Sequence, residues 1–338
     1  MRRKGIALVG LGLAVRPHAL SLMDLSAEAE VLYAVSQSQA RCAAFAADYP
    51  FPTATDLEKA LTDERVEAVI LLTPPSTHRD LGSRILESGR HLLIEKPVGL
   101  VTADAEALQA LAEARGLKLG VVFQHRFRPA FLRLAELVAE GSLGPLAAGH
   151  CRVPWWRPQS YYDEPGRGMF ARDGGGVLLT QAIHTLDLLR ALVGRIDIHS
   201  SLVSTTALHE MEAEDHVAAL ATFGGRAPGT IMATTACYPG FPETIDLVFA
   251  TATAHLEGGV LNLFRHDGSS ETVGRSQAFG SGADPMAFAH DAHRALITDF
   301  LRAIDEDRAP AVSGADIVAT RRLIDAMFAR SISKGIAP

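Results

Sequence analysis

The first 123 residues alternate short apolar runs with helix-like segments, and this alternation limits the possible folds more than any other feature. The apolar runs include Gly5–Gly10, Val66–Thr73 and Leu117–Phe123. Strands that alternate with helices in this way predict βαβ units and a parallel sheet. A parallel sheet is covered on both faces, which explains why these runs are mostly apolar and do not alternate.

The pattern changes after about residue 124. A helix is predicted over Gly176–Leu192, and several strand-like runs follow it, such as His216–Thr222 and Thr244–Thr251. Strands in succession after one helix predict an antiparallel or mixed sheet with helices on one face. Two helices near Met286–Ile304 and Ala315–Ser331 close the chain, and they are free to pack back on the first domain. We expect two domains, over residues 1–123 and 124–338.

Composition excludes several classes of function. The 338 residues carry a net charge of −7 without a long basic run, so nucleic acid is not an expected partner. Three scattered cysteines favour a reducing compartment, and we expect a cytoplasmic protein. The basic start before Gly5 imitates a signal peptide, but Gly10 and Gly12 break the apolar run. No run is expected to span a membrane.

Gly10-Leu11-Gly12 lies between the first strand and the first helix, where a dinucleotide fingerprint belongs. Glycines there let the backbone turn tightly and approach a pyrophosphate at the helix N-terminus. The third glycine of the fingerprint is replaced by Val15, so the alternative is a plain glycine-rich turn. The surrounding βαβ unit favours a bound cofactor.

The end of the second strand bears on the choice of cofactor. NAD-selective sites usually place an acid there to bind the ribose 2′-hydroxyl, whereas this chain has Ser36-Gln37-Ser38-Gln39-Ala40-Arg41. Neutral side chains with a nearby arginine accept a 2′-phosphate, which favours NADP over NAD. The alternative is that Arg41 faces solvent and that the site takes either cofactor.

Glu95-Lys96-Pro97 ends the apolar run His91–Ile94. Proline fixes its own φ and lacks an N–H group, so it stops the strand sharply. Lys96 is then expected at the carboxyl edge of the sheet, where open α/β folds bind ligands. Taken alone, the tripeptide would be a surface charge pair.

His184 lies within the apolar helix predicted from Gly176 to Leu192. Thr180 precedes it by four residues and Asp187 follows by three, so the three side chains are expected on roughly one helix face, with Gln181 at its edge. A histidine in such a helix is most often a core residue. Its near-neutral pKa also suits proton transfer.

Together these features resemble the Gfo/Idh/MocA oxidoreductase family over essentially the whole chain. The resemblance is carried by Gly10-Leu11-Gly12, Thr73-Pro74-Pro75 with His78, Glu95-Lys96-Pro97, Arg126-Phe127 and the segment 174–184. It implies an α/β protein with an N-terminal Rossmann domain and a C-terminal α/β domain on a large open, mostly antiparallel sheet. It also implies a nicotinamide cofactor, a sugar, sugar acid or cyclitol substrate, and a homodimer or homotetramer formed through that sheet.

The resemblance makes Lys96 and His184 the catalytic residues. Lys96 would donate a hydrogen bond to the reacting oxygen, and His184 would transfer the hydroxyl proton. Many relatives carry Asp four residues before this histidine, where the chain has Thr180, which leaves the division of labour open. Two alternatives also stay open: glycoside cleavage with a recycled NAD, and a dinucleotide-binding sensor without catalysis.

The loop from Trp155 to Tyr162 is rich in aromatic residues that can stack on sugar rings, and arginines can clamp a carboxylate or phosphate. The equal alternative is a loop packed on its own domain. The candidate cofactor-binding residues are Gly10, Gly12, Leu13, Ser36, Gln37, Arg41, Thr73, Pro74, Pro75, His78, Glu95, Lys96 and Gln124. The candidate substrate-binding residues are Lys96, His125, Arg157, Tyr161, Arg167, Thr180, Gln181, His184 and Tyr238.

His290 and His293, with Asp291 between them, have a spacing that supports metal ligation. The sequence offers no third ligand, and polar residues at a helix start explain them more simply. We expect no metal site.

Overall fold

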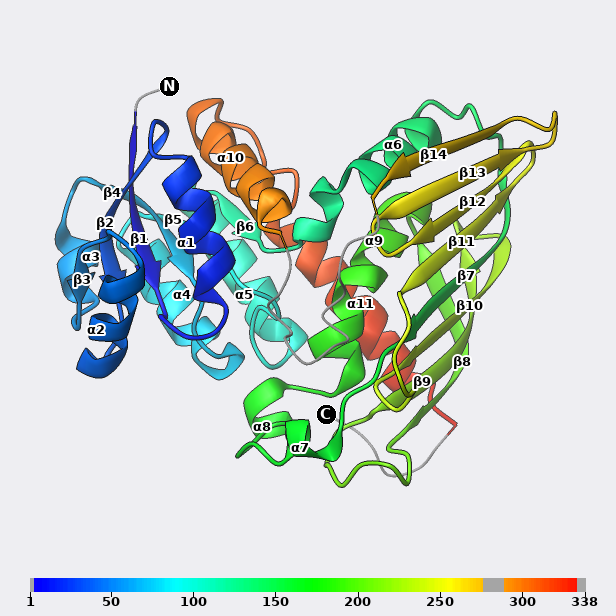
Figure 1. Ribbon diagram of the computed structural model, residues 1–338, viewed down its shortest axis with the longest axis horizontal. Helices are drawn as coiled ribbons and strands as arrows, with labels where there is room; N and C mark the ends of the chain where they lie inside the picture. Colours follow the sequence, from blue (N-terminus) through cyan, green and yellow to red (C-terminus); the bar gives the residue numbers. More distant parts are fainter. Residues whose placement is uncertain (1–2, 276–288, 333–338) are drawn as a thin grey trace. The chain divides into compact units, whose positions relative to one another are not determined.

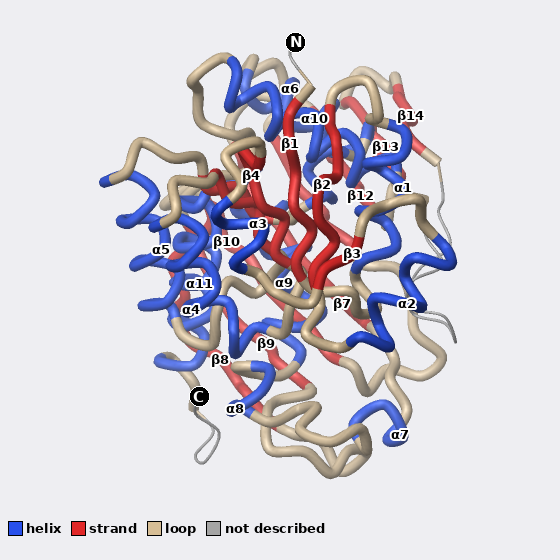
Figure 2. The backbone as a smooth tube through the Cα atoms, turned by 90° about the vertical axis from the view of Figure 1, so that its left-hand side faces the viewer, coloured by secondary structure: helices blue, strands red, loops and turns tan. Residues whose placement is uncertain are grey.

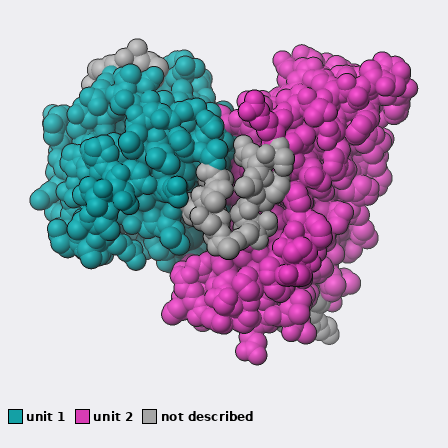
Figure 3. All heavy atoms as spheres, viewed as in Figure 1, with its two compact units in different colours: residues 1–124, 289–318 teal, residues 125–288, 319–338 magenta. Residues whose placement is uncertain are grey.

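The computed structural model describes residues 3–275 and 289–332. The chain divides into two compact units (Figure 3). Unit 1 consists of Met1–Gln124 with Ala289–Val318, and unit 2 of His125–Phe288 with Ala319–Pro338.

Unit 1 is built on a six-stranded, wholly parallel sheet with the order β3-β2-β1-β4-β5-β6. The strands β3, β2, β1 and β4 run side by side in Figure 2. All six residues of β1 are buried, as continuous apolar strands require. The order is that of a dinucleotide-binding Rossmann fold, so the predicted parallel sheet is confirmed. The strands are β1 (Lys4–Val9), β2 (Ala29–Val35), β3 (Thr53–Ala54), β4 (Val66–Leu71), β5 (His91–Ile94) and β6 (Leu119–Val121).

Helices follow the strands of unit 1. They are α1 (Val15–Asp24), α2 (Gln39–Asp48), α3 (Glu58–Thr62), α4 (His78–Glu87), α5 (Thr102–Ala114) and α10 (Asp291–Asp305), with a short 3₁₀ turn at Pro75–Thr77. The helix predicted near Met286–Ile304 begins at Asp291, and residues 286–288 lie outside the described part of the chain. α10 packs against α1 (Figure 1).

A second late segment also completes unit 1. The backbone N–H of Val121 in β6 donates to Val312, and Gly120 forms an isolated bridge with Ser313. The helix that follows, α11 (Gly314–Ala329), begins in unit 1 and ends in unit 2. The edge strand β6 of unit 1 is therefore bonded to residues that come much later in the chain.

Unit 2 is built on an eight-stranded sheet with the order β14-β13-β12-β11-β7-β10-β9-β8 (Figure 1). Among the described strand pairs, β7 with β10 is parallel and the other six are antiparallel. The prediction of a large, mostly antiparallel sheet is therefore confirmed. The strands are β7 (Leu146–Pro154), β8 (Ile196–Ser204), β9 (His216–Phe223), β10 (Ala227–Thr234), β11 (Thr244–Phe249), β12 (Ala252–Glu257), β13 (Val260–Arg265) and β14 (Ser270–Gly274).

Burial alternates along most strands of unit 2, as in β11, because one face of the sheet carries helices. α6 (Pro129–Ala139) packs on β12, β13 and β14, and α9 (Ile183–Val193) packs on β7. Two short helices, α7 (Gln159–Tyr162) and α8 (Phe170–Asp173), lie in the connection after β7.

The expectation that no run reaches membrane-spanning length needs a correction. The helical segment Phe170–Val193 is long and apolar enough by length and composition, with a mean hydropathy of 1.3 in its most apolar window. That window is 78% buried within the protein. A core helix of a folded domain accounts for this pattern.

Candidate functional site

The turn after β1 requires its first glycine. Gly10 has φ +104°, and a Cβ on it would lie within 2.9 Å of the backbone of Leu72 and Thr73. A Cβ on Gly12 would instead enter open space. α1 begins without a side-chain cap or an acidic residue in its first turn, which leaves its N–H groups suited to a phosphate. Leu13 is 80% exposed beside this turn.

Two serines after β2 form hydrogen bonds at the start of α2. Ser38 caps the helix by accepting the backbone N–H of Arg41, and the Ser36 hydroxyl accepts the backbone N–H of Ser38 at 3.3 Å. The side chains of Gln37 and Arg41 are exposed, and the first turn of α2 holds no acid. The first turn of α2 therefore carries no acid that would repel a 2′-phosphate.

The segment after β4 is fixed by its own side chains. The Thr77 hydroxyl donates to Thr73 Oγ1 at 2.7 Å and lies 2.8 Å from the Pro74 carbonyl. His78 is fully buried, with its ring nitrogens 2.9 Å from the Pro97 carbonyl and 2.6 Å from the Thr73 carbonyl. Burial lowers the pKa of His78. His78 therefore connects the segment that carries Thr73 with the segment that carries Lys96. Pro74 is exposed and Pro75 is half-buried.

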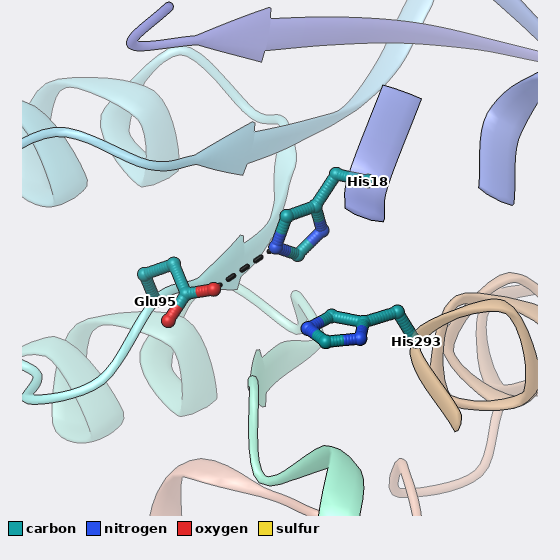
Figure 4. Close-up of side chains that lie close together, drawn as sticks. All are labelled: His18, Glu95 and His293. Carbon is teal, nitrogen blue, oxygen red and sulfur yellow. Dashed lines mark hydrogen bonds and ion pairs between the residues drawn. The ribbon is translucent and has the colours of Figure 1, made fainter. Parts of the chain in front are cut away.

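Lys96 follows β5 directly and is half-buried. Burial lowers the pKa of its amine, and the Glu95 carboxylate opposes that shift. Burial alone would raise the pKa of Glu95, but the hydrogen bond from His18, with the charges of Lys96 and His293, holds it below its ordinary value (Figure 4). The strand end thus carries a carboxylate beside an amine that loses its proton more readily than an exposed lysine. Gln124 is half-buried and ends the first segment of unit 1.

His184 lies on α9 of unit 2 and is 8% exposed. Its ring stacks on that of His125, with centroids 4.6 Å apart. The Arg128 guanidinium lies 2.8 Å from His125 Nε2. Because a guanidinium only donates, Nε2 must accept, and His125 is neutral with its proton on Nδ1.

The helix predicted over Gly176–Leu192 is present, but it is not α-helical throughout, so the α-helical spacing assumed for Thr180 does not hold. Residues Leu178–Ala182 form a π-turn that leads into α9. A Cβ on Gly176 would lie 1.8 Å from the Glu214 carbonyl, so only glycine allows this approach. The Thr180 hydroxyl donates to the Gly176 carbonyl and contacts the buried Gln181 side chain. A π-turn changes the phase of the helix, so α-helical spacing does not relate Thr180 to His184.

Asp187 is fully buried and binds the Arg126 guanidinium through both carboxylate oxygens, each at 2.6 Å. The Thr320 hydroxyl also donates to it at 3.2 Å. The pair ties α9 to the segment that carries His125.

An Asp187→Ala variant is expected to lose about 3–5 kcal/mol of unfolding free energy, because it leaves the Arg126 charge buried without its carboxylate. Urea unfolding measures the loss. Asp197→Ala is the matched control, since Asp197 pairs with the exposed Arg195 and should cost less than about 1 kcal/mol. Equal small losses in both variants would contradict this role for Asp187.

Glu214 holds the start of the π-turn. Its two carboxylate oxygens accept the backbone N–H groups of Gly176 at 2.9 Å and Leu178 at 3.0 Å. Burial raises the pKa of Glu214 to about 7, against the effect of these donors.

A folded-state pKa above the ordinary 4.5 means that protonation of Glu214 favours the folded protein. This contribution is complete below about pH 4.5 and is lost as the pH rises through 7. The free energy of unfolding should therefore fall by about 2–3 kcal/mol between roughly pH 5 and 8, relative to Glu214→Gln, which mimics the protonated acid. Glu212→Gln, at an exposed acid nearby, should track the unmodified protein. A constant difference across this range would refute the assignment.

The aromatic loop mostly packs on itself. The Arg157 guanidinium is buried over Trp155 and Tyr161, and Arg167 lies 4.1 Å from the Tyr161 ring centre and pairs with Glu164. Both arginines therefore have partners of their own. Tyr238, 76% exposed, meets Trp156 edge to face.

His209 fixes this loop, and sequence reasoning missed it. Its ring nitrogens lie 2.7 Å from Asp215 Oδ2 and 2.8 Å from the Arg157 carbonyl, which are both acceptors. Both nitrogens must carry protons for both bonds to form. The pairing of His209 with Asp215, six residues on, had no local sequence signal.

His18 and Glu214 were also missed. Each acts on a residue far along the chain, so no local motif marks it. Arg128 was missed although it lies only three residues from His125, and His293 was considered only as a metal ligand. His18 lies eight residues after Gly10 on α1, and the only available signal was a buried histidine beside a glycine-rich turn.

Two family models match the chain. "Oxidoreductase family, NAD-binding Rossmann fold" matches residues 4–123, and "GFO/IDH/MocA C-terminal domain" matches residues 131–255. The chain is 30% identical over 193 residues to the uncharacterized oxidoreductase YdgJ of Escherichia coli, covering 56% of this chain and 53% of that protein. It is 21% identical over 266 residues to scyllo-inositol 2-dehydrogenase (NAD(+)) of Bacillus subtilis, covering 77% and 74%. The chain spans about half the length of the first curated relatives that it matches.

A solved structure agrees over nearly the full length. The WlbA dehydrogenase of Bordetella pertussis, in complex with NADH and UDP-GlcNAcA, superposes with a TM-score of 0.82 and 25% identity, covering 97% of this chain and 96% of that one. One family accounts for both halves of the sequence and for the fold. The chain belongs to the Gfo/Idh/MocA family of oxidoreductases.

Proposed function

We propose that this protein is an NAD(P)-dependent dehydrogenase or reductase. It transfers a hydride between the nicotinamide C4 and a carbon that carries a hydroxyl or carbonyl group in a sugar, sugar acid or cyclitol. The observation that supports this most is Lys96, a half-buried amine at the carboxyl end of β5 beside the ionised Glu95. Ligands bind at this edge of open parallel sheets.

Lys96 donates a hydrogen bond to the reacting oxygen and stabilises negative charge as it develops there. Its lowered pKa also lets the amine exchange a proton with a substrate hydroxyl more readily than an exposed lysine can. His184 accepts the hydroxyl proton in the oxidation and returns it in the reduction. The stacked His125 is neutral, so it adds no charge that would oppose protonation of His184.

The turn after β1 supports a bound dinucleotide. Open space at Gly12, the uncapped start of α1 and the exposed Leu13 together suit a pyrophosphate with an apolar group beside it. The absence of an acid between Ser36 and Arg41 favours NADP as the cofactor. The inositol dehydrogenase relative is named for NAD(+), and the WlbA structure contains NADH. The relative affinity of this protein for NADH and NADPH therefore has to be measured.

We also propose that copies of the chain associate through the outer face of the unit 2 sheet. Leu202, Leu220 and Phe264 are 42%, 57% and 54% exposed on its strands. Leu202 and Leu220 lie on the neighbouring strands β8 and β9, whereas Phe264 lies on β13 toward the other edge of the sheet. Large apolar side chains exposed on a sheet face support an interface there. A mass measured by light scattering that equals a single chain would refute the association.

The function is tested in two steps. Fluorescence titration with NADH and NADPH first measures cofactor binding and preference. A panel of sugars, uronic acids and inositols is then screened in both directions by the change in reduced-cofactor absorbance. Binding without turnover on any class would favour the sensor alternative, and consumption of a glycoside without net cofactor change would favour recycling of the cofactor.

A further inference from the structure

Three side chains from separate elements of unit 1 meet at the end of β5. His18 comes from α1, Glu95 follows β5, and His293 comes from α10 (Figure 4). Their nitrogen and oxygen atoms all lie within 4.8 Å of one another. The two histidines are 0% and 2% exposed, and the Glu95 side chain is 14% exposed. His293 therefore lies beside His18 and Glu95, and not in a metal site with its sequence neighbours His290 and Asp291.

Two histidines and a carboxylate could hold a divalent metal, but the contacts favour a hydrogen bond. His18 Nε2 lies 2.9 Å from Glu95 Oε1, so Nε2 carries the proton that it donates. A metal on Nε2 would force that proton to Nδ1. In the described part of the chain, Nδ1 of His18 is buried and finds no hydrogen-bond acceptor. Histidines that bind metals normally donate their other N–H to a partner, and a buried N–H without one is costly.

Glu95 is engaged through both oxygens. Oε1 accepts from His18, and Oε2 accepts the backbone N–H of Lys96 at 3.1 Å. The carboxylate cannot turn without losing one of these bonds. It therefore fixes the peptide group that leads into Lys96, and hence the direction in which the lysine side chain leaves the strand.

We propose that His18 and His293 are positioning residues that hold Glu95 as an oriented anion and thereby fix the place and charge of the Lys96 amine. The proposal depends on the proposed function only in giving Lys96 a catalytic role. The His293 ring meets the His18 ring edge to face, with centroids 5.1 Å apart. The ionisable groups that act on or respond to Glu95 are His18 from α1, His293 from α10, Lys96 beside it and His78 from α4.

The charge of the cluster gives it a distinctive pH signature. Burial raises the pKa of Glu95 and the histidines lower it, with the hydrogen bond from His18 as the largest opposing effect. Without His18, the carboxylate should take up a proton at a higher pH than in the unmodified protein. Lys96 would then lose the anion that keeps its amine charged.

The test compares His18→Leu, which removes the donor, with His18→Gln, which keeps an N–H donor at this position. His290→Gln is the matched control, because His290 lies on the same helix turn as His293 but bonds Asp24 instead. In His18→Leu we expect kcat to fall about tenfold at roughly pH 6, and the deficit to shrink toward pH 8. His18→Gln should recover most of the loss, and His290→Gln should match the unmodified enzyme.

A loss of kcat that is equal at every pH would show a merely structural role and overturn the proposal, as would an unchanged profile in His18→Leu. One equivalent of zinc in the purified protein that disappears in His18→Leu and His293→Leu would also overturn it. Should His18→Leu fail to fold, His293→Gln takes its place.

A measurement without turnover separates this inference from the proposed function. NMR of histidine labelled with ¹⁵N should show His18 protonated at Nε2, with a resonance that moves in Glu95→Gln and stays in place in His290→Gln. An unprotonated Nε2 would refute the proposal that His18 positions Glu95, even in an active enzyme. If Nε2 is protonated but the protein turns over none of the substrates, the positioning role of His18 stands and only the proposed dehydrogenase activity is refuted.

Discussion

A Lys96→Met variant should lose roughly 10²–10³-fold in kcat and should still bind cofactor. Methionine keeps the length of the side chain but cannot donate to the reacting oxygen, so negative charge that develops there is left unstabilised. Stopped-flow or steady-state absorbance of the reduced cofactor measures kcat, and fluorescence titration measures the dissociation constant of the cofactor.

Lys118→Met is the matched control for this variant. Lys118 belongs to the same unit and pairs with the exposed Asp307 at 2.6 Å. We expect its kcat to remain within about twofold of the unmodified enzyme. Turnover of Lys96→Met at the level of the control would rule out Lys96 as the donor.

A His184→Asn variant should lose about 10²–10⁴-fold in kcat, because asparagine can hydrogen-bond but cannot carry the proton. The loss should fall on kcat rather than on the cofactor dissociation constant, which depends on residues of unit 1. His199→Asn, at an exposed histidine of β8, is the control in the same unit. If His184→Asn lowers only the melting temperature, His184 is a core histidine and proton transfer lies elsewhere.

The two sheets could be predicted from local sequence patterns, and the elements that could not be predicted lack such a pattern for physical reasons. Buried runs such as Val66–Leu71 indicate a strand because every residue except Glu67 is apolar. β3 has only two residues, and β14 is polar and half-exposed, so neither carries such a pattern. The π-turn at Leu178–Ala182 is set by the Glu214 side chain, which receives N–H bonds from residues 36 and 38 positions away.

The candidate site divides in the same way. Gly10 and Lys96 could be found because a turn and a strand end mark them locally. The group formed by His18, Glu95 and His293 could not, because His18 and His293 are 275 residues apart in the chain and α10 must pack on α1 to bring them together. The Arg126 and Asp187 pair needs the fold of unit 2 in the same way.

The late segments of unit 1 carry a consequence for biosynthesis. When Gln124 leaves the ribosome, every strand of the nucleotide-binding sheet exists, yet the helix that covers α1 and the residues that bridge β6 are still untranslated. More than 160 further residues must be synthesised before the second segment of unit 1 appears, and part of α1 stays uncovered until then. Chaperone contact during that interval would be directed to the side chains of α1 that α10 later covers, and completion of unit 1 would be among the last events of folding rather than the first.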